Sequence, residues 1–190
     1  MDAIKELRDK TGISVMQCKR ALEEAGGEME KALVILRKAA GAAALKKADR
    51  QLGAGTIQSY IHSGGAVAAL VELRSETDFV SNNAEFTALA RDIAMHVTAA
   101  NPQYLRREDV SEASLQAARE VFAKEAEGKP EAMRENIVAG KMDAYFNESV
   151  LLEQPFIKDG TRTIRDLIES ATQKFGEKVE ITRFVRFSIK

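Results

Sequence analysis

The sequence predicts an α+β protein, in which an N-terminal three-helix bundle precedes a domain with a three-stranded antiparallel sheet and an antiparallel helical pair. Three observations support this class. Apolar residues recur at helical spacing through residues 1–40, they alternate with polar residues in two later stretches, and helical patterns fill the sequence between those stretches. We place the three-helix domain at residues 1–40, a helical extension and linker at 41–55, and the α+β core at 56–190.

The first 40 residues predict three short helices, at about 3–9, 14–25 and 28–38. Ser14 and Gln17 have the spacing of a capping box, in which each side chain satisfies an amide of the first turn. The apolar stripe of the second helix consists of Val15, Cys18, Leu22 and Ala25. Because each helix has one such stripe, the three helices can enclose a small core.

From residue 56 the spacing of apolar residues changes to that of strands. Turn residues at 62–65 separate Ile57 and Ile61 from an alternating stretch at 67–73, and this arrangement predicts a β-hairpin. The final strand is expected to present one apolar face, made of Val179, Ile181, Val185, Phe187 and Ile189. This strand would complete the three-stranded antiparallel sheet.

Helical patterns occupy the sequence between the hairpin and the final strand. The first of these helices can be capped by Asn82 with Glu85. Two charged helices follow, around residues 115–122 and 130–150, and their length indicates an antiparallel pair. A last helix begins at Thr163 and stops at Gly176, which are favourable residues for a start and an end.

Composition limits the classes of function. Lys and Arg total 28 against 29 Asp and Glu in 190 residues, so the net charge of -1 gives no electrostatic reason to expect nucleic acid or an anionic membrane as a partner. The single cysteine, Cys18, excludes an intramolecular disulfide framework, and two histidines leave little for a metal site. The sequence has no signal-peptide core and no long apolar run, so we expect a cytoplasmic protein without a membrane span, a metal or a cofactor.

The common spaced motifs of enzymes are absent from the sequence, including the nucleophile elbow, the zincin helix and the Walker A loop. Gly53 and Gly55 begin a dinucleotide fingerprint, but Gln58 occupies the third glycine position and a strand follows. His62 and His96 have no second ligand at metal-binding spacing. We therefore expect no catalytic residues.

Two apolar residues stand in polar surroundings. Phe79 lies in the polar segment 75–83, where a strand leads into a helix, and it either packs back on that helix as a hydrophobic staple or contacts a partner. Met16 falls on the charged helix face opposite Cys18, and it is either a singly exposed methionine or part of a protein contact. The residues alone leave both choices open.

Three segments, taken together, resemble the translation elongation factor Ts family, whose members are guanine-nucleotide exchange factors of elongation factor Tu. The segments are TGISVMQCKRALE at 11–23, TDFV at 77–80 and LLEQPF at 151–156. The order and spacing of these segments extend the resemblance over nearly the whole chain, to the closing FVRF at 184–187.

The resemblance implies two sets of residues that bind elongation factor Tu. Residues 1–40 would form a ubiquitin-associated-like domain that contacts the partner's nucleotide-binding domain through Arg8, Val15, Met16 and Lys19. The segment at 77–80 would approach the partner's magnesium site, and it contains Thr77, Asp78, Phe79 and Val80. Phe79 would wedge into an apolar crevice, and Asp78 would help to rearrange polar groups near the phosphates. This mechanism is conformational and needs no catalytic acid or base.

The resemblance also implies a short form with one copy of the core subdomain. Such forms pair, so we expect a homodimer in which residues 56–190 are the core and dimerization domain. The chain would bind elongation factor Tu in its GDP-bound and nucleotide-free states and leave when GTP binds. Two alternatives remain: a tether that binds proteins without exchange activity, and a small transferase or hydrolase with an unrecognised site.

Overall fold

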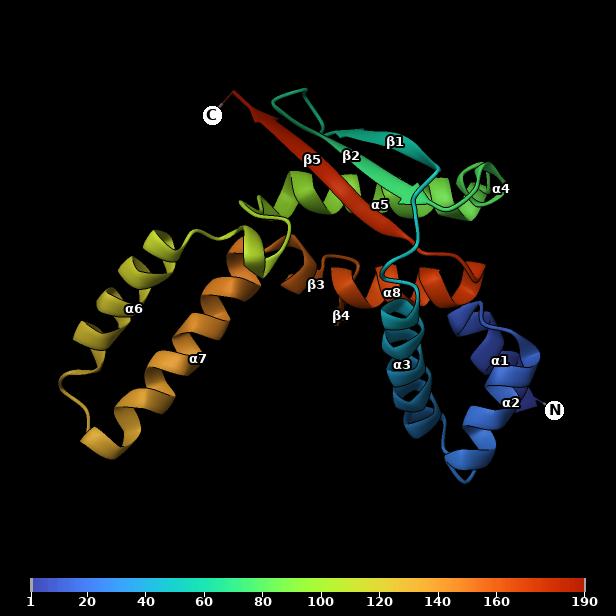
Figure 1. Cartoon of the computed structure of the whole chain (residues 1–190), viewed down its shortest axis with the longest axis horizontal. Coiled ribbons are helices and arrows are strands. Elements are labelled where there is room, and N and C mark those ends of the chain that lie inside the picture. Colours follow the sequence, from blue (N-terminus) through green and yellow to red (C-terminus); the bar gives the residue numbers. More distant parts are fainter. Residues whose placement is uncertain (1, 190) are drawn as a thin grey trace.

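The computed structural model describes residues 2–189 and has the predicted α+β architecture (Figure 1). Its α-helices are α1 (Asp2–Thr11), α2 (Val15–Glu24), α3 (Met29–Lys46), α4 (Asp78–Ser81), α5 (Ala84–Ala100), α6 (Glu112–Ala126), α7 (Glu131–Ser149) and α8 (Ile164–Phe175). Short 3-10 helices lie at η1 (Arg107–Asp109) and η2 (Leu151–Glu153). The strands are β1 (Ala54–Ile61), β2 (Val67–Ser75), β3 (Pro155–Phe156), β4 (Asp159–Thr163) and β5 (Glu180–Ser188).

The N-terminal helices enclose a small core of their own, as predicted. Its buried members are Leu7, Ile13, Cys18, Ala21, Leu22, Ala25, Ala32 and Leu36. Ser14 caps α2, because its Oγ accepts a bond from the Gln17 amide at 3.4 Å. The reciprocal half of the predicted capping box is replaced by a longer-range contact, since Gln17 Oε1 accepts a bond from Gln173 Nε2 at 3.2 Å.

One part of the predicted N-terminal stripe is wrong. Val15 is 47% exposed, whereas Cys18 is fully buried. Val15 is the first residue of α2, where the chain enters the helix at the edge of the bundle, so its side chain lies outside the core. The third helix is longer than the expected 28–38, because α3 continues to Lys46 and includes residues 41–46 of the predicted extension and linker.

The main sheet has the order β1-β2-β5, and both pairs are antiparallel. Helix α5 lies against one face of the sheet, and α8 lies below α5 (Figure 1). The largest fully buried side chains of this core include Phe86, Ile93 and Val97 of α5, Leu73 of β2 and Ile181 of β5. The opposite face of the sheet is not covered by another element of the described chain.

A β-bulge in β5 contradicts the predicted single apolar face of the last strand. Glu72 pairs with Arg183 and Leu73 pairs with Ile181, so Thr182 is an extra residue in the ladder. Such a residue reverses the alternation of side chains beyond it. Ile181 is consequently buried in the core, while Val185 and the residues that follow it in alternation are exposed on the outer face.

The predicted helical pair forms an antiparallel hairpin, α6–α7, that projects away from the sheet (Figure 1). The cap of α5 lies one residue later than expected, since Asn83 Oδ1 accepts a bond from the Glu85 amide at 2.8 Å. Helix α8 starts and stops as predicted, with Thr163 as its N-cap and Gly176 in the left-handed conformation after its last residue. The small β3–β4 ribbon was not predicted. Strand β3 has only two residues, which is too short for an alternating pattern to show in the sequence.

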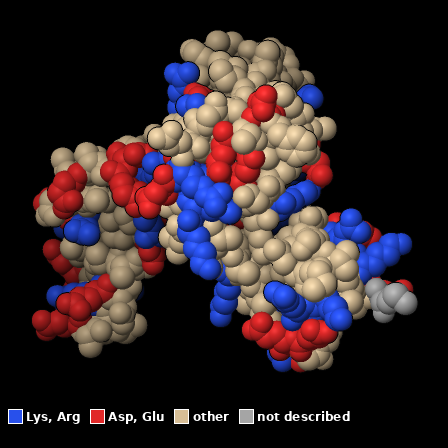
Figure 2. All heavy atoms as spheres, turned by 45° about the vertical axis from the view of Figure 1, so that its right-hand side comes forward, with Lys and Arg blue, Asp and Glu red and all other residues tan. Residues whose placement is uncertain are grey.

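Charged residues are distributed without a large region of one sign on the face seen in Figure 2, which matches the near-neutral net charge. Acidic and basic side chains alternate over the hairpin and the N-terminal helices in that view. The top of the molecule, where the sheet lies, carries mostly uncharged atoms. Among residues 2–189, no helix is long and apolar enough to cross a membrane.

Candidate partner-binding site

The segment predicted to contact a partner forms α4, a single helical turn between β2 and α5 (Figure 1). Phe79 is 85% exposed there, and Thr77 and Asp78 are exposed beside it. A hydrophobic staple requires the ring to pack on the following helix. The exposure of Phe79 removes that alternative and leaves a large apolar ring in water on a short turn.

The backbone of this turn is held from both ends. Thr77 donates its N–H and its hydroxyl to the two carboxylate oxygens of Glu177, at 3.0 and 2.6 Å, and Ser75 Oγ donates to the Thr77 carbonyl at 3.0 Å. Val80 is 3% exposed and packs in the main core. Phe79 therefore projects from a turn that is fixed on either side, and Val80 serves as its anchor rather than as an exposed contact residue.

Glu76 forms a second fixed point beneath the turn. Its Oε1 accepts a bond from the Lys178 amide at 2.6 Å, and its carboxylate accepts two bonds from Arg50 Nη1, at 3.1 and 3.2 Å. Burial opposes the ionisation of Glu76, but these bonds and the charge of Arg50 hold its pKa below the ordinary value. A side chain at Gly53 would come within 2.7 Å of the Glu76 carbonyl oxygen, so this approach requires glycine.

Sequence patterns did not identify Glu76 and Glu177 as supports of the turn. Glu177 is 100 residues away from Thr77, and no local spacing could indicate that the two residues meet. Glu76 was part of the polar segment, but its partners Arg50 and Lys178 lie on either side of it in sequence at long range.

The other predicted contact residues form an exposed surface on α1 and α2, which we call the Met16 surface and define as Arg8, Val15, Met16 and Lys19. Met16 is 61% exposed, and Val15 beside it is 47% exposed. Arg8 and Lys19 are exposed cations, and Lys19 lies 3.7 Å from Glu23. The surface thus combines two adjacent apolar side chains with basic neighbours.

Helix α4 and the helices α1 and α2, which carry the Met16 surface, lie toward the same end of the molecule, with the end of α8 between them (Figure 1). Gln173 of α8 bonds to Gln17 of α2, and Lys174 forms an ion pair with Glu85 of α5, immediately after the turn. Helix α2 and the start of α5 are therefore both bonded to the last turns of α8.

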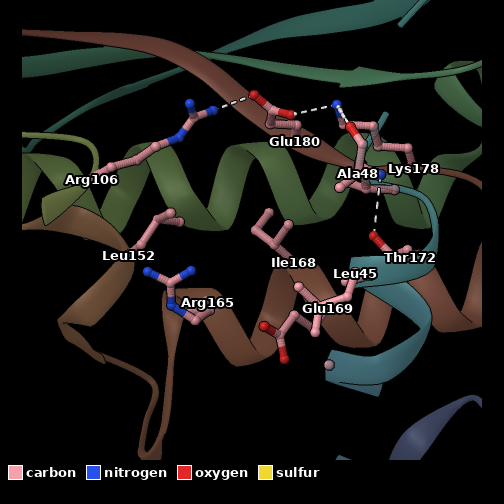
Figure 3. A pocket seen from close by; sticks show the side chains of 13 residues that line it. Leu45, Ala48, Arg106, Leu152, Arg165, Ile168, Glu169, Thr172, Lys178 and Glu180 are labelled. Atoms are coloured by element: carbon pink, nitrogen blue, oxygen red, sulfur yellow. Dashed lines mark hydrogen bonds and ion pairs between the residues drawn. The ribbon is translucent and has the colours of Figure 1, made fainter. Parts of the chain in front are cut away.

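A groove of about 460 Å³ lies between α3, α8 and the start of β5 (Figure 3). Leu45, Leu152 and Ile168 supply apolar lining. On its rim, Glu180 pairs with Arg106 and lies 3.1 Å from Lys178 Nζ. Lys178 Nζ also donates to the Ala48 carbonyl at 2.7 Å, so these groups link the segment after α3 to the core.

Glu169 and His96 are two partly or fully buried titratable residues outside the α4 turn and the Met16 surface. Burial raises the pKa of Glu169 in the groove above its ordinary value. His96 is fully buried under the sheet, where its Nε2 lies 2.9 Å from Gln154 Oε1 and its Nδ1 accepts a bond from the Ile157 amide at 3.3 Å. Within residues 2–189, no group of three or more His, Cys, Asp or Glu residues could hold a metal ion.

Comparison with known proteins identifies one family. The family model described as Elongation factor TS matches residues 21–190. The chain is 50% identical over 188 residues to the Elongation factor Ts of Carboxydothermus hydrogenoformans, a match that covers 98% of this chain and 87% of the relative. It is 47% identical over 188 residues to that of Desulforamulus reducens, with the same coverage, and 46% identical over 187 residues to that of Thermodesulfovibrio yellowstonii, covering 98% and 94%.

Proposed function

The chain belongs to the elongation factor Ts family, and from this membership we propose that it is a guanine-nucleotide exchange factor of translation elongation. It binds elongation factor Tu with GDP, promotes release of GDP by disturbing the magnesium and phosphate site, and leaves when GTP binds. The reaction requires no covalent chemistry from this chain. The observation that carries the proposal is the 85% exposed ring of Phe79 on a turn that its neighbours hold fixed.

A fixed turn favours this mechanism for an energetic reason. Insertion of an aromatic ring into a partner stabilises the complex only by the amount that exceeds the cost of ordering the segment. The two bonds from Thr77 to Glu177 and the burial of Val80 provide that order before the partner binds. Buried aromatic side chains contribute strongly to protein contacts, typically about 2 kcal/mol or more for a central residue.

Exchange follows from unequal binding to two states of the partner. A factor that binds nucleotide-free elongation factor Tu more tightly than the GDP-bound form must weaken GDP binding by the same ratio. The Met16 surface provides binding energy in both states, whereas Phe79 and Asp78 act near the magnesium and phosphate site. This division assigns affinity to the N-terminal helices and exchange to the α4 turn.

The apolar outer face of the sheet supports the proposal that the chain is a homodimer. Its exposed members are Ile57, Ile61, Leu70, Val185 and Phe187. Two sheets pack face to face when their inner surfaces are apolar, and a two-fold axis presents the same surface from each copy. A second copy of this sheet would cover these side chains, with the Glu72–Arg183 ion pair within the contact.

Release of fluorescent GDP from purified elongation factor Tu tests the exchange proposal. We expect the wild-type chain to accelerate release and Phe79→Ala to lose most of that acceleration, while Met133→Ala retains it. Met133 is a matched control because it is a 54% exposed apolar residue on α7, away from the turn. Equal acceleration by Phe79→Ala would remove the wedge role, and no acceleration by the wild type would favour the tether.

A further inference from the structure

A cavity of about 300 Å³ lies at the junction between the N-terminal helices and the core. Its walls come from the end of α1, from α3, from β4 and from α8. Leu33 and Leu36 contribute apolar lining, and the charged lining includes Arg37, Asp159 and Arg162. Neither the α4 turn nor the Met16 surface contributes a residue to it, so the cavity is distinct from the proposed partner contacts.

Positive charge exceeds negative charge around this cavity. Lys10, Arg37 and Arg162 carry three positive charges in its lining, and Asp159 carries one negative charge. Lys10 is already paired with Glu6 at 2.8 Å. Arg37 has no hydrogen bond or ion pair with the residues between 2 and 189, and Arg162 has no ion pair within that range. Asp159 is the carboxylate that the two arginines share in the lining, and Asp166, outside the lining, is a second negative charge near Arg162.

The Arg162 guanidinium is held in place through one nitrogen. Nη2 donates to Ser170 Oγ at 2.9 Å, and Ser170 Oγ donates to the Asp166 carbonyl at 2.6 Å. The remaining nitrogens, Nε and Nη1, donate to no acceptor in the described part of the chain. Because this side chain is half-buried, its free N–H groups are costly unless an acceptor reaches them.

The charges around Arg162 come from both the N-terminal helices and the core. Burial lowers the pKa of Arg162, Asp159 and Asp166 raise it, and the positive charge of Arg37 lowers it further. Asp159 is oriented by its own turn, since its Oδ1 accepts bonds from the Thr161 amide and hydroxyl at 3.1 and 2.6 Å. Arg162 thus lies near two carboxylates and a second arginine, and its Nε and Nη1 groups have no acceptor in the described part of the chain.

We propose that this cavity binds an oxyanion of the phosphate class that bridges Arg37 and Arg162. The planar guanidinium group offers paired donors that match two oxygens of a phosphate. Arg37 belongs to α3 and Arg162 to β4, so the bound anion links the N-terminal helices to the core. It would fix the Met16 surface relative to the α4 turn.

Calorimetric titration of the full chain with sodium phosphate tests this site, with ionic strength held constant by sodium chloride. We expect saturable binding by the wild type and an affinity about tenfold lower in Arg37→Gln, since a charge-assisted hydrogen bond is lost. Arg37 is exposed, so this variant should fold normally. Arg91→Gln is the matched control, because Arg91 is an exposed arginine of α5 outside the cavity lining.

The proposal is overturned if the wild type shows no saturable binding, or if Arg37→Gln and Arg91→Gln bind phosphate equally well. A parallel titration with GDP separates a free phosphate from a nucleotide phosphate as the source of the anion. Tighter binding of GDP that is weakened by Arg37→Gln supports the nucleotide source, and weaker binding of GDP than of phosphate supports the free anion.

Discussion

Phe79 and Val80 are adjacent in sequence but occupy opposite environments, at 85% and 3% exposure. The sequence could identify the polar segment around them and could not decide where the ring points, because a staple and an exposed probe have the same local pattern. The direction is set by tertiary contacts, namely the clamp of Thr77 by Glu177 and the packing of Val80 under the sheet.

This difference predicts unequal effects of two neighbouring substitutions on stability. Val80→Ala should lower the free energy of unfolding by about 2 kcal/mol, because it removes buried methyl groups and leaves a cavity. Phe79→Ala should change it by less than about 0.5 kcal/mol, since an exposed side chain loses few contacts. Urea unfolding of both variants measures this, and a larger loss in Phe79→Ala would contradict the exposed position of the ring.

His96 predicts a pH dependence of stability. Burial lowers the pKa of the imidazole, and the bond to Gln154 raises it by less. The unfolded chain therefore takes up a proton at about pH 6.5, where the native protein does not. The free energy of unfolding should fall as the pH decreases below about 6.5, by at most about 1.4 kcal/mol per pH unit from this residue.

The control for this prediction is His96→Asn, which cannot titrate. We expect this variant to be less stable at neutral pH, because it loses the packing and bonds of the ring, and to lose less stability than the wild type between about pH 6.5 and 5.5. Chemical unfolding at several pH values gives both slopes. Parallel slopes for the two proteins would show that His96 does not cause the dependence.

At the scale of elements, the sequence predicts a helix end correctly where the residues that start or stop the helix lie within a few positions of that end. Both ends of α8 could be predicted, because Thr163 and Gly176 carry their own start and stop chemistry. The outer face of β5 could not be predicted, because the bulge at Thr182 depends on how β5 pairs with β2. The same limitation hid the β3–β4 ribbon.

The capping box of α8 provides a test at this scale. Thr163 Oγ1 accepts a bond from the Asp166 amide at 3.1 Å, and Asp166 Oδ2 accepts one from the Thr163 amide at 2.9 Å. Thr163→Ala should lower the free energy of unfolding by about 1 kcal/mol. Thr163→Ser should keep most of the wild-type stability, because serine also has a hydroxyl that can cap the helix. Urea unfolding distinguishes them, and equal losses would mean that the hydroxyl does not cap the helix.

At the scale of the whole molecule, the outer sheet face predicts the state of assembly. Phe187→Glu should convert the proposed dimer to monomer, because it places a charge within the proposed apolar contact. Met133→Glu on the projecting hairpin should leave the assembly unchanged, since that residue lies outside the sheet. Sedimentation velocity measures both variants, and a Phe187→Glu dimer would place the contact elsewhere.

The central claim is that this chain favours the nucleotide-free state of elongation factor Tu. The most direct measurement is its affinity for the purified partner by calorimetry, first without nucleotide and then with saturating GDP and magnesium. We predict markedly tighter binding without nucleotide, with GDP affinity reduced by the same ratio in the complex. Equal affinity in both states would contradict exchange by this chain and would identify it as a tether.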